Sequence, residues 1–164
     1  MPPYDGRLLA NLILDFADGE QAGLTNASVN KLLYFSHGLY LQRKGRRLVK
    51  NAFEAWEYGP VIPAVFEAFR SNGKNPISER AKKFSPILNQ YVEFDADVAP
   101  ADVDFVYRVW KTLGRFTAGE LIDLSHEVGS PWHSLWEGDD IKVRPGMIIT
   151  DSEILQHFES AHTV

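Results

Sequence analysis

Hydrophobic residues recur at helical spacing over much of this chain. In residues 5–17 the leucine, isoleucine and phenylalanine side chains fall on one stripe, and Gly19 ends the segment. The longest such segment is 26–44, with Thr25 as the expected N-cap and Gly45 at the position where many helices end. Two long helices are therefore predicted near the start of the chain.

The period changes from helical to alternating in residues 48–58, which predicts a short strand. Tyr58, Gly59 and Pro60 then predict a tight turn. Glycine accepts positive φ there, and proline at the first position of a helix loses only an N–H that has no partner within the helix. A third helix is expected over 60–72.

The second half of the chain is less regular. Residues 75–99 show no sustained period, so we expect a loop with one weak strand at 90–94. Helical spacing returns over 101–113. A short strand at 147–149 and a final helix after it are also expected.

Capping patterns mark where the later helices begin. Thr117 and Glu120 have the Ser/Thr-x-x-Glu spacing, in which each side chain binds a backbone N–H at the start of the helix. The same spacing recurs in residues 150–153, and the Gly-Ser-Pro run at 129–131 predicts the end of one helix and the start of the next. The fold class predicted is mainly α, a compact single helical domain of about six or seven helices with a small β element, over residues 1–164.

Composition limits the classes of function. The chain has 164 residues, 45% of them hydrophobic and 24% charged, which fits one globular domain. The net charge of -5 disfavours nucleic acid and anionic membranes as partners. The absence of cysteine excludes disulfides and thiol catalysis, and we read no signal peptide or membrane span. A reducing compartment is expected.

No catalytic pattern stands out. The five histidines lack the spacing of a metal site, and we find neither a nucleophile elbow nor a phosphate-binding glycine loop. We therefore expect no enzyme activity, no metal and no cofactor.

A basic run and a pair of aromatic residues are the main candidates for binding. The run RKGRRLVK, 43–50, either docks an acidic partner or a phosphate backbone, or complements the dipole at the end of the preceding helix. Trp56 and Tyr58 share one face of the predicted strand, as core residues or as exposed anchors of an interface. We expect His126 to hydrogen-bond to Glu57 or to the backbone of the neighbouring turn.

Four segments in order resemble the Panacea antitoxin domain family, also called SocA-like or phage-associated GepA-like. They are KLLYFSHGLYLQRKGRRL (31–48), FEAWEYGPVIPAVFEAF (53–69), LIDLSHEVGSPWHSLW (121–136) and the helix-forming end around 148–158. The resemblance covers nearly the whole chain, and its basic RKGRR turn departs from the family's usual, less charged segment.

The resemblance implies a bacterial cytoplasmic or prophage protein that neutralises a toxin encoded nearby by binding it directly. One member type implies the alternative, an adaptor that delivers its toxin to a AAA+ protease. Toxins in the family vary widely, so the partner is not named by the resemblance.

Site residues follow from the motifs. The predicted partner contacts are Tyr58, His37 on the polar side of its helix, Arg43, Arg46 and Arg47. The predicted structural frame behind them is Trp56, Glu57, Gly59, Pro60, His126, Pro131 and Trp132.

Overall fold

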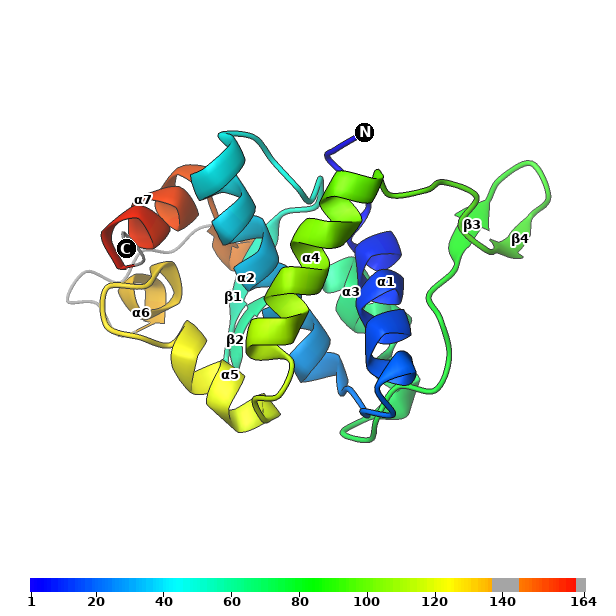
Figure 1. Cartoon of the computed structure of the whole chain (residues 1–164), viewed down its shortest axis with the longest axis horizontal. Coiled ribbons are helices and arrows are strands. Elements are labelled where there is room, and N and C mark those ends of the chain that lie inside the picture. Colours follow the sequence, from blue (N-terminus) through cyan, green and yellow to red (C-terminus); the bar gives the residue numbers. More distant parts are fainter. Residues whose placement is uncertain (137–144, 162–164) are drawn as a thin grey trace.

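The computed structural model describes residues 1–136 and 145–161 (Figure 1). In these residues the helices are α1 (Gly6–Gly19), α2 (Asn26–Lys44), α3 (Pro63–Ala68), α4 (Pro100–Leu113), α5 (Ala118–Ser125), α6 (Pro131–Trp136) and α7 (Asp151–Ala161), with 3₁₀ turns η1 (Arg70–Asn72) and η2 (Pro145–Met147). The strands are β1 (Phe53–Trp56), β2 (Gly59–Val61), β3 (Lys83–Ser85), β4 (Gln90–Val92) and β5 (Ile148–Ile149). The predicted mainly α fold with a small β element is confirmed.

Helix α2 is the centre of the fold. Helices α1, α3, α4, α5 and α7 and strand β2 all pack against it (Figure 1). Its two ends are as predicted, because Thr25 accepts a hydrogen bond from the Ser28 backbone and Gly45 has a φ of 66°. Polar residues of α2, among them Asn30 and Lys31, are buried with the apolar ones. The expectation of a polar side facing water was therefore wrong, since these side chains bind backbone groups of neighbouring elements.

The central sheet has the order β2-β1-β5 and is antiparallel throughout. Trp56 pairs with Gly59, so the turn is formed by residues 57–58 and not by 58–60 as predicted. Pro60 lies in the edge strand β2, where a missing N–H is tolerated, and Pro63 takes the first position of α3 instead. The predicted strand of 48–58 shortens to β1.

A second hairpin, β3–β4, projects away from the helices (Figure 1). It confirms a strand within the predicted range 90–94, whereas its partner strand was not predicted. Side chains of both strands are exposed or half-buried, so the partner strand lacks the alternation of buried and exposed residues that reveals a strand in a sequence.

The predicted starts of α5 and α7 are confirmed, whereas α5 ends at Ser125 and not at the predicted Gly129. Glu120 N donates to Thr117 Oγ1 at 3.1 Å and Thr117 N donates to Glu120 Oε1 at 3.2 Å, which completes the capping box of α5. Glu153 N donates to Thr150 Oγ1 at 3.2 Å at the start of α7. Each helix therefore begins where its sequence pattern placed it.

Helix α7 closes the core with an aromatic side chain. The Phe158 ring lies against Gly38 of α2 so closely that an added Cβ would overlap it. Tyr34 meets the same ring edge to face, with centroids 5.7 Å apart, and meets Phe53 of β1 at 5.5 Å. Only glycine at position 38 leaves room for the Phe158 ring.

Candidate partner-binding surface

The turn between β1 and β2 presents Tyr58 to solvent. The Tyr58 side chain is 64% exposed, and the Glu57 side chain beside it is exposed too. Gly59 directly follows the turn and has a φ of 109°, a backbone conformation that is unfavourable for residues with a Cβ atom. The hairpin therefore holds an aromatic ring outward on a short, fully paired ribbon.

Three of the four segments that carry the family resemblance, 31–48, 53–69 and 121–136, meet beneath this turn. A Cβ on Gly59 would lie 2.6 Å from Lys31 Cε and 2.6 Å from Ser125 Oγ, with His126 Nε2 at 3.4 Å. Lys31 comes from α2 and the other two from the end of α5. Only glycine fits this contact, so these three segments pack together around the hairpin.

Helix α2 covers the free edge of β2 with two polar side chains. Lys31 Nζ donates to the Pro60 carbonyl at 3.1 Å, and Asn30 Oδ1 accepts from Ile62 N at 3.0 Å. Lys31 is 1% exposed, and burial lowers the pKa of its ammonium group to about 7. Neither residue was predicted as a site residue from the sequence. The position of Lys31 directly before the apolar run LLYF could have indicated that this lysine is buried.

Helix α6 covers the other edge of the hairpin with two indoles. Trp132 Nε1 donates to the Trp56 carbonyl at 2.6 Å, and Trp136 Nε1 donates to the Ala55 carbonyl at 2.9 Å. The His126 ring stacks on Trp132 with centroids 3.4 Å apart. These contacts join α5 and α6 to β1, while a hydrogen bond from His126 to Glu57 or to the turn backbone stays a prediction.

Two prolines and a half-buried tryptophan complete the frame. Pro131 is buried at the first position of α6, and Pro60 is buried in β2. Trp56 is partly buried, and its ring meets Phe66 edge to face at 5.0 Å. The predicted frame residues therefore lie together around one hairpin, with Glu57 at its exposed turn.

His37 is buried and does not lie on a polar surface of α2. It is 0% exposed, its Nδ1 accepts from Val49 N at 3.2 Å, and its Nε2 lies 2.9 Å from Asp151 Oδ1. Because Nδ1 accepts an N–H, the proton of the neutral ring is on Nε2 and is donated to Asp151. The prediction that His37 lies on the polar side of α2, where it could contact a partner, was therefore wrong. The ring is buried and links α2 to the start of α7.

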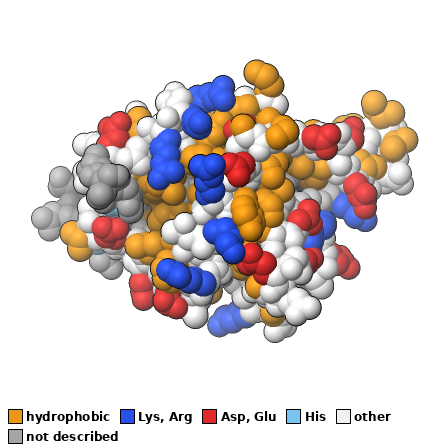
Figure 2. Space-filling view, viewed as in Figure 1, with side chains coloured by type: hydrophobic (Ala, Val, Ile, Leu, Met, Phe, Trp, Pro, Cys, Tyr) orange, Lys and Arg blue, Asp and Glu red, His pale blue; other side chains and the backbone are white. Residues whose placement is uncertain are grey.

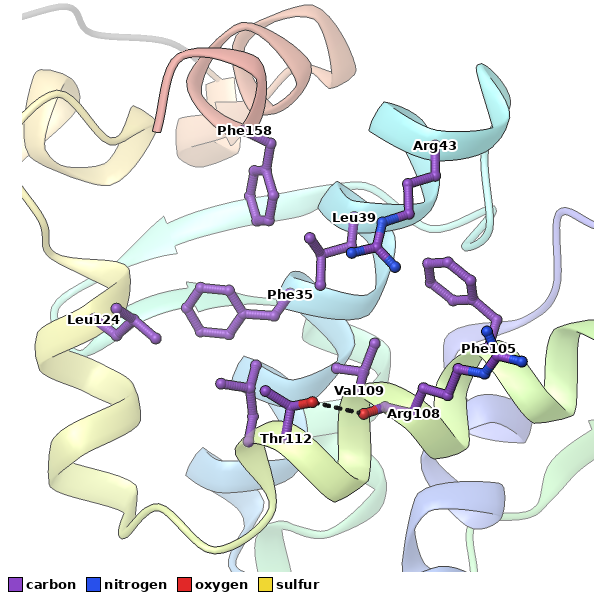
Figure 3. Close-up of a pocket in the computed structure, with 10 residues that line it drawn as sticks. Phe35, Leu39, Arg43, Phe105, Arg108, Val109, Thr112, Leu124 and Phe158 are labelled. Atoms are coloured by element: carbon purple, nitrogen blue, oxygen red, sulfur yellow. Dashed lines mark hydrogen bonds between the residues drawn. The ribbon is translucent and has the colours of Figure 1, made fainter. Parts of the chain in front are cut away.

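The basic turn divides into arginines with different surroundings. Arg47 Nε pairs with Asp151 Oδ2 at 2.7 Å, and the Arg46 guanidinium lies 5.9 Å from the centre of the Tyr40 ring. The hydrogen bond from His37 and the charge of Arg47 lower the pKa of Asp151. Arg43 lies instead at a hollow beside α4 (Figure 3). Figure 2 shows basic side chains over the end of α2.

A buried carboxylate was also missed. Asp102 is 5% exposed and accepts hydrogen bonds from the Tyr4 hydroxyl at 2.7 Å and the Tyr40 hydroxyl at 2.8 Å. Burial and these bonds raise the pKa of both tyrosines. Asp102 thus ties α4 to the N-terminal segment and to α2, a role that its place in an acidic stretch of sequence did not suggest.

Across residues 1–136 and 145–161, no group of three or more histidine, cysteine or acidic side chains is arranged to hold a metal ion. Within the same residues, no helix is long and apolar enough to cross a membrane. The exposed groups of the surface described above are aromatic rings, arginines and carboxylates.

Comparison with known proteins identifies the family. The model of the antitoxin SocA-like Panacea domain matches residues 29–133. The chain belongs to this family. Antitoxin SocA of Caulobacter vibrioides (strain NA1000 / CB15N) is 38% identical to it over 168 residues, which cover 96% of this chain and 88% of that protein. No solved structure gives a significant match. The match covers most of α2, the β1–β2 hairpin, α5 and the first half of α6, which contribute to the hairpin frame.

Proposed function

We propose that this SocA-like protein is an antitoxin that neutralises a toxin encoded nearby by binding it directly, with residues 1–164 acting as one domain in the cytoplasm. The observation that carries the proposal is the exposed Tyr58 ring on a hairpin held by the family's own motifs. Tyrosine is among the residue types that dominate binding energy in interfaces, and a rigid support lowers the entropy lost on binding. Binding of this kind needs no catalytic group.

Tyr58→Ala tests the anchor. Its loss should weaken toxin binding by roughly tenfold, as truncation of an aromatic anchor commonly does. The free energy of unfolding should stay within about 0.5 kcal/mol of the unchanged protein, because the ring is exposed. Isothermal titration calorimetry with the co-expressed toxin measures the first quantity, and urea unfolding measures the second.

Tyr91→Ala is the matched control for this experiment. Tyr91 is 68% exposed on the other hairpin, so its removal deletes the same ring without touching the frame. Equal affinity of the Tyr58→Ala and unchanged proteins for the toxin would remove Tyr58 from the interface.

An adaptor that delivers the toxin to a AAA+ protease is the second candidate, and it rests on the family resemblance alone. A direct binder protects cells that lack the protease, whereas an adaptor does not. Growth rescue in a protease-deficient strain therefore separates the two functions.

A further inference from the structure

A groove lined by hydrophobic residues runs between α2, α4, α5 and α7. Its first hollow has a volume of about 370 Å³. Figure 3 shows Phe35 and Leu39 of α2, Phe105 of α4, Leu124 of α5 and Phe158 of α7 around it. The Thr112 hydroxyl donates to the Arg108 carbonyl at 3.0 Å, so that polar group is already bound within α4. The floor of the groove is therefore apolar.

A second hollow continues the groove. It has a volume of about 440 Å³ and shares Leu124 with the first. Phe116 supplies its apolar surface, and Glu120, Asp123 and Glu127 surround it. Leu124 and Phe116 are only partly buried, so apolar surface extends from one hollow to the next.

The two ends of the groove carry opposite charge. At the first hollow Arg43 reaches in from the end of α2 and Arg108 lies along α4 beside Phe105 (Figure 3). Arg43 makes no ion pair with any residue that the structure describes, and Arg108 pairs with Asp104 at 2.8 Å. The second hollow has three carboxylates, with Arg115 nearby over the Phe116 ring. One end is thus basic and the other acidic.

We infer that this groove binds an amphipathic helix of the toxin, with carboxylates at the end that meets Arg43 and basic residues at the end that meets Asp123. The inference rests on the proposed function and assigns a second contact surface to it. A helix that presents an apolar stripe to a groove between helices is a recurrent mode of peptide recognition. Opposite charges at the two ends fix which way the helix lies, because the reversed orientation brings like charges together.

Two synthetic peptides test the charge arrangement. Each has about 18 residues, enough for five helical turns, and the same leucine stripe. One gathers glutamates at one end and lysines at the other, while its control has the same residues with the charges mixed along its length. Fluorescence anisotropy should give a dissociation constant roughly tenfold lower for the first. Equal affinities, or no binding of either peptide, would overturn the inference.

Surface variants test the place of binding. Arg43→Glu with Arg108→Glu should weaken binding of the first peptide by roughly tenfold, because two attractions become repulsions. The control changes two exposed cations outside the groove, Arg70→Glu with Lys74→Glu, and should bind as the unchanged protein does. Thermal unfolding checks that both variants are folded. Retained affinity in the first variant overturns the assignment.

Growth rescue by the same variants separates this inference from the proposed function. Rescue by the unchanged protein and its loss in the Arg43→Glu/Arg108→Glu variant support both. Full rescue by that variant overturns the groove as the toxin site and leaves the antitoxin function intact. If the unchanged protein binds the peptide but neither binds the toxin nor rescues growth, the proposed function fails and the groove keeps its specificity for such a helix.

Discussion

Lys31 is buried in the core. In place of water, its ammonium group has one backbone carbonyl as a hydrogen-bond acceptor. Its Cε lies against Gly59, and its Nζ donates a hydrogen bond to the Pro60 carbonyl. A buried ammonium is disfavoured relative to the neutral amine, which is why its pKa falls to about 7. The same hydrogen bond covers the free edge of β2. Burying the Lys31 ammonium group costs free energy, but the bond that it makes there holds the hairpin against α2.

The pH dependence of stability should report this residue. The unfolded chain keeps the Lys31 pKa near 10.5 and the folded chain has it near 7, so between these values the unfolded state binds more protons. Stability from this group therefore rises with pH across that window, by up to about 1.4 kcal/mol per pH unit. Lys31→Met should remove that rise.

Urea unfolding at pH 7, 8 and 9 measures the effect of Lys31→Met. Lys74→Met, at an exposed lysine, is the control and should follow the unchanged protein. Parallel stability profiles for the Lys31→Met and unchanged proteins would show that the ammonium is not desolvated.

Between elements, the junction of α2 and α7 depends on one carboxylate. Asp151 accepts from His37, which is buried in α2, and pairs with Arg47 of the basic turn. Its removal leaves a buried imidazole N–H without its acceptor, a loss that ordinarily costs more than an exposed ion pair contributes. The hydrogen bond between His37 and Asp151 therefore contributes more than the Arg47 ion pair to holding the last helix in place.

Asp151→Ala should lower the free energy of unfolding at pH 7 by about 1–3 kcal/mol. The folded pKa of Asp151 is lowered, so its stabilisation is present above pH 3.8 and is lost as the pH falls below that value. The variant and the unchanged protein should accordingly converge in acid. Asp104→Ala, which breaks an exposed pair with Arg108, should cost less than about 0.5 kcal/mol. An equal cost for the two variants would contradict this account.

For the molecule as a whole, the projecting hairpin is the most exposed apolar feature among the described residues. Ile87 is 95% exposed and Leu88 is 60% exposed at its tip. Ile87→Ser with Leu88→Ser should leave the melting temperature within about 2 °C, since little packing is lost. It should also reduce light scattering of concentrated protein, because exposed apolar side chains promote association. Unchanged scattering would show that the tip does not drive self-association.

Local signals in the sequence were enough to predict most helices. Thr117 with Glu120 and Thr25 with Gly45 marked helix ends correctly, because caps depend on residues close in the chain. Of the three residues packed around Gly59, His126 was named as a frame residue from the sequence, whereas Lys31 and Ser125 were not. The burial of His37 could not be predicted, since its partners Val49 and Asp151 are brought to it by tertiary packing.

The turn at residues 57–58 shows a second limit. Pro60 and Pro63 are both compatible with the start of a helix, and the sequence alone favoured the first. Pairing of β2 with β1 decided the matter, because it extends the chain through Pro60. The apolar groove was likewise invisible in the sequence, as four separate helices contribute to it.

Strand β5 joins the sheet from near the far end of the chain, where Phe53 meets Ile149 and Glu54 meets Ile148. During synthesis on the ribosome, β1 and β2 are made well before this third strand. In the nascent chain, one edge of β1 therefore stays unpaired until β5 has been made. The Tyr34 ring likewise lacks its contact with Phe158 until α7 has been made. On the proposed function, the hairpin that carries Tyr58 gains its third strand only once translation has passed β5.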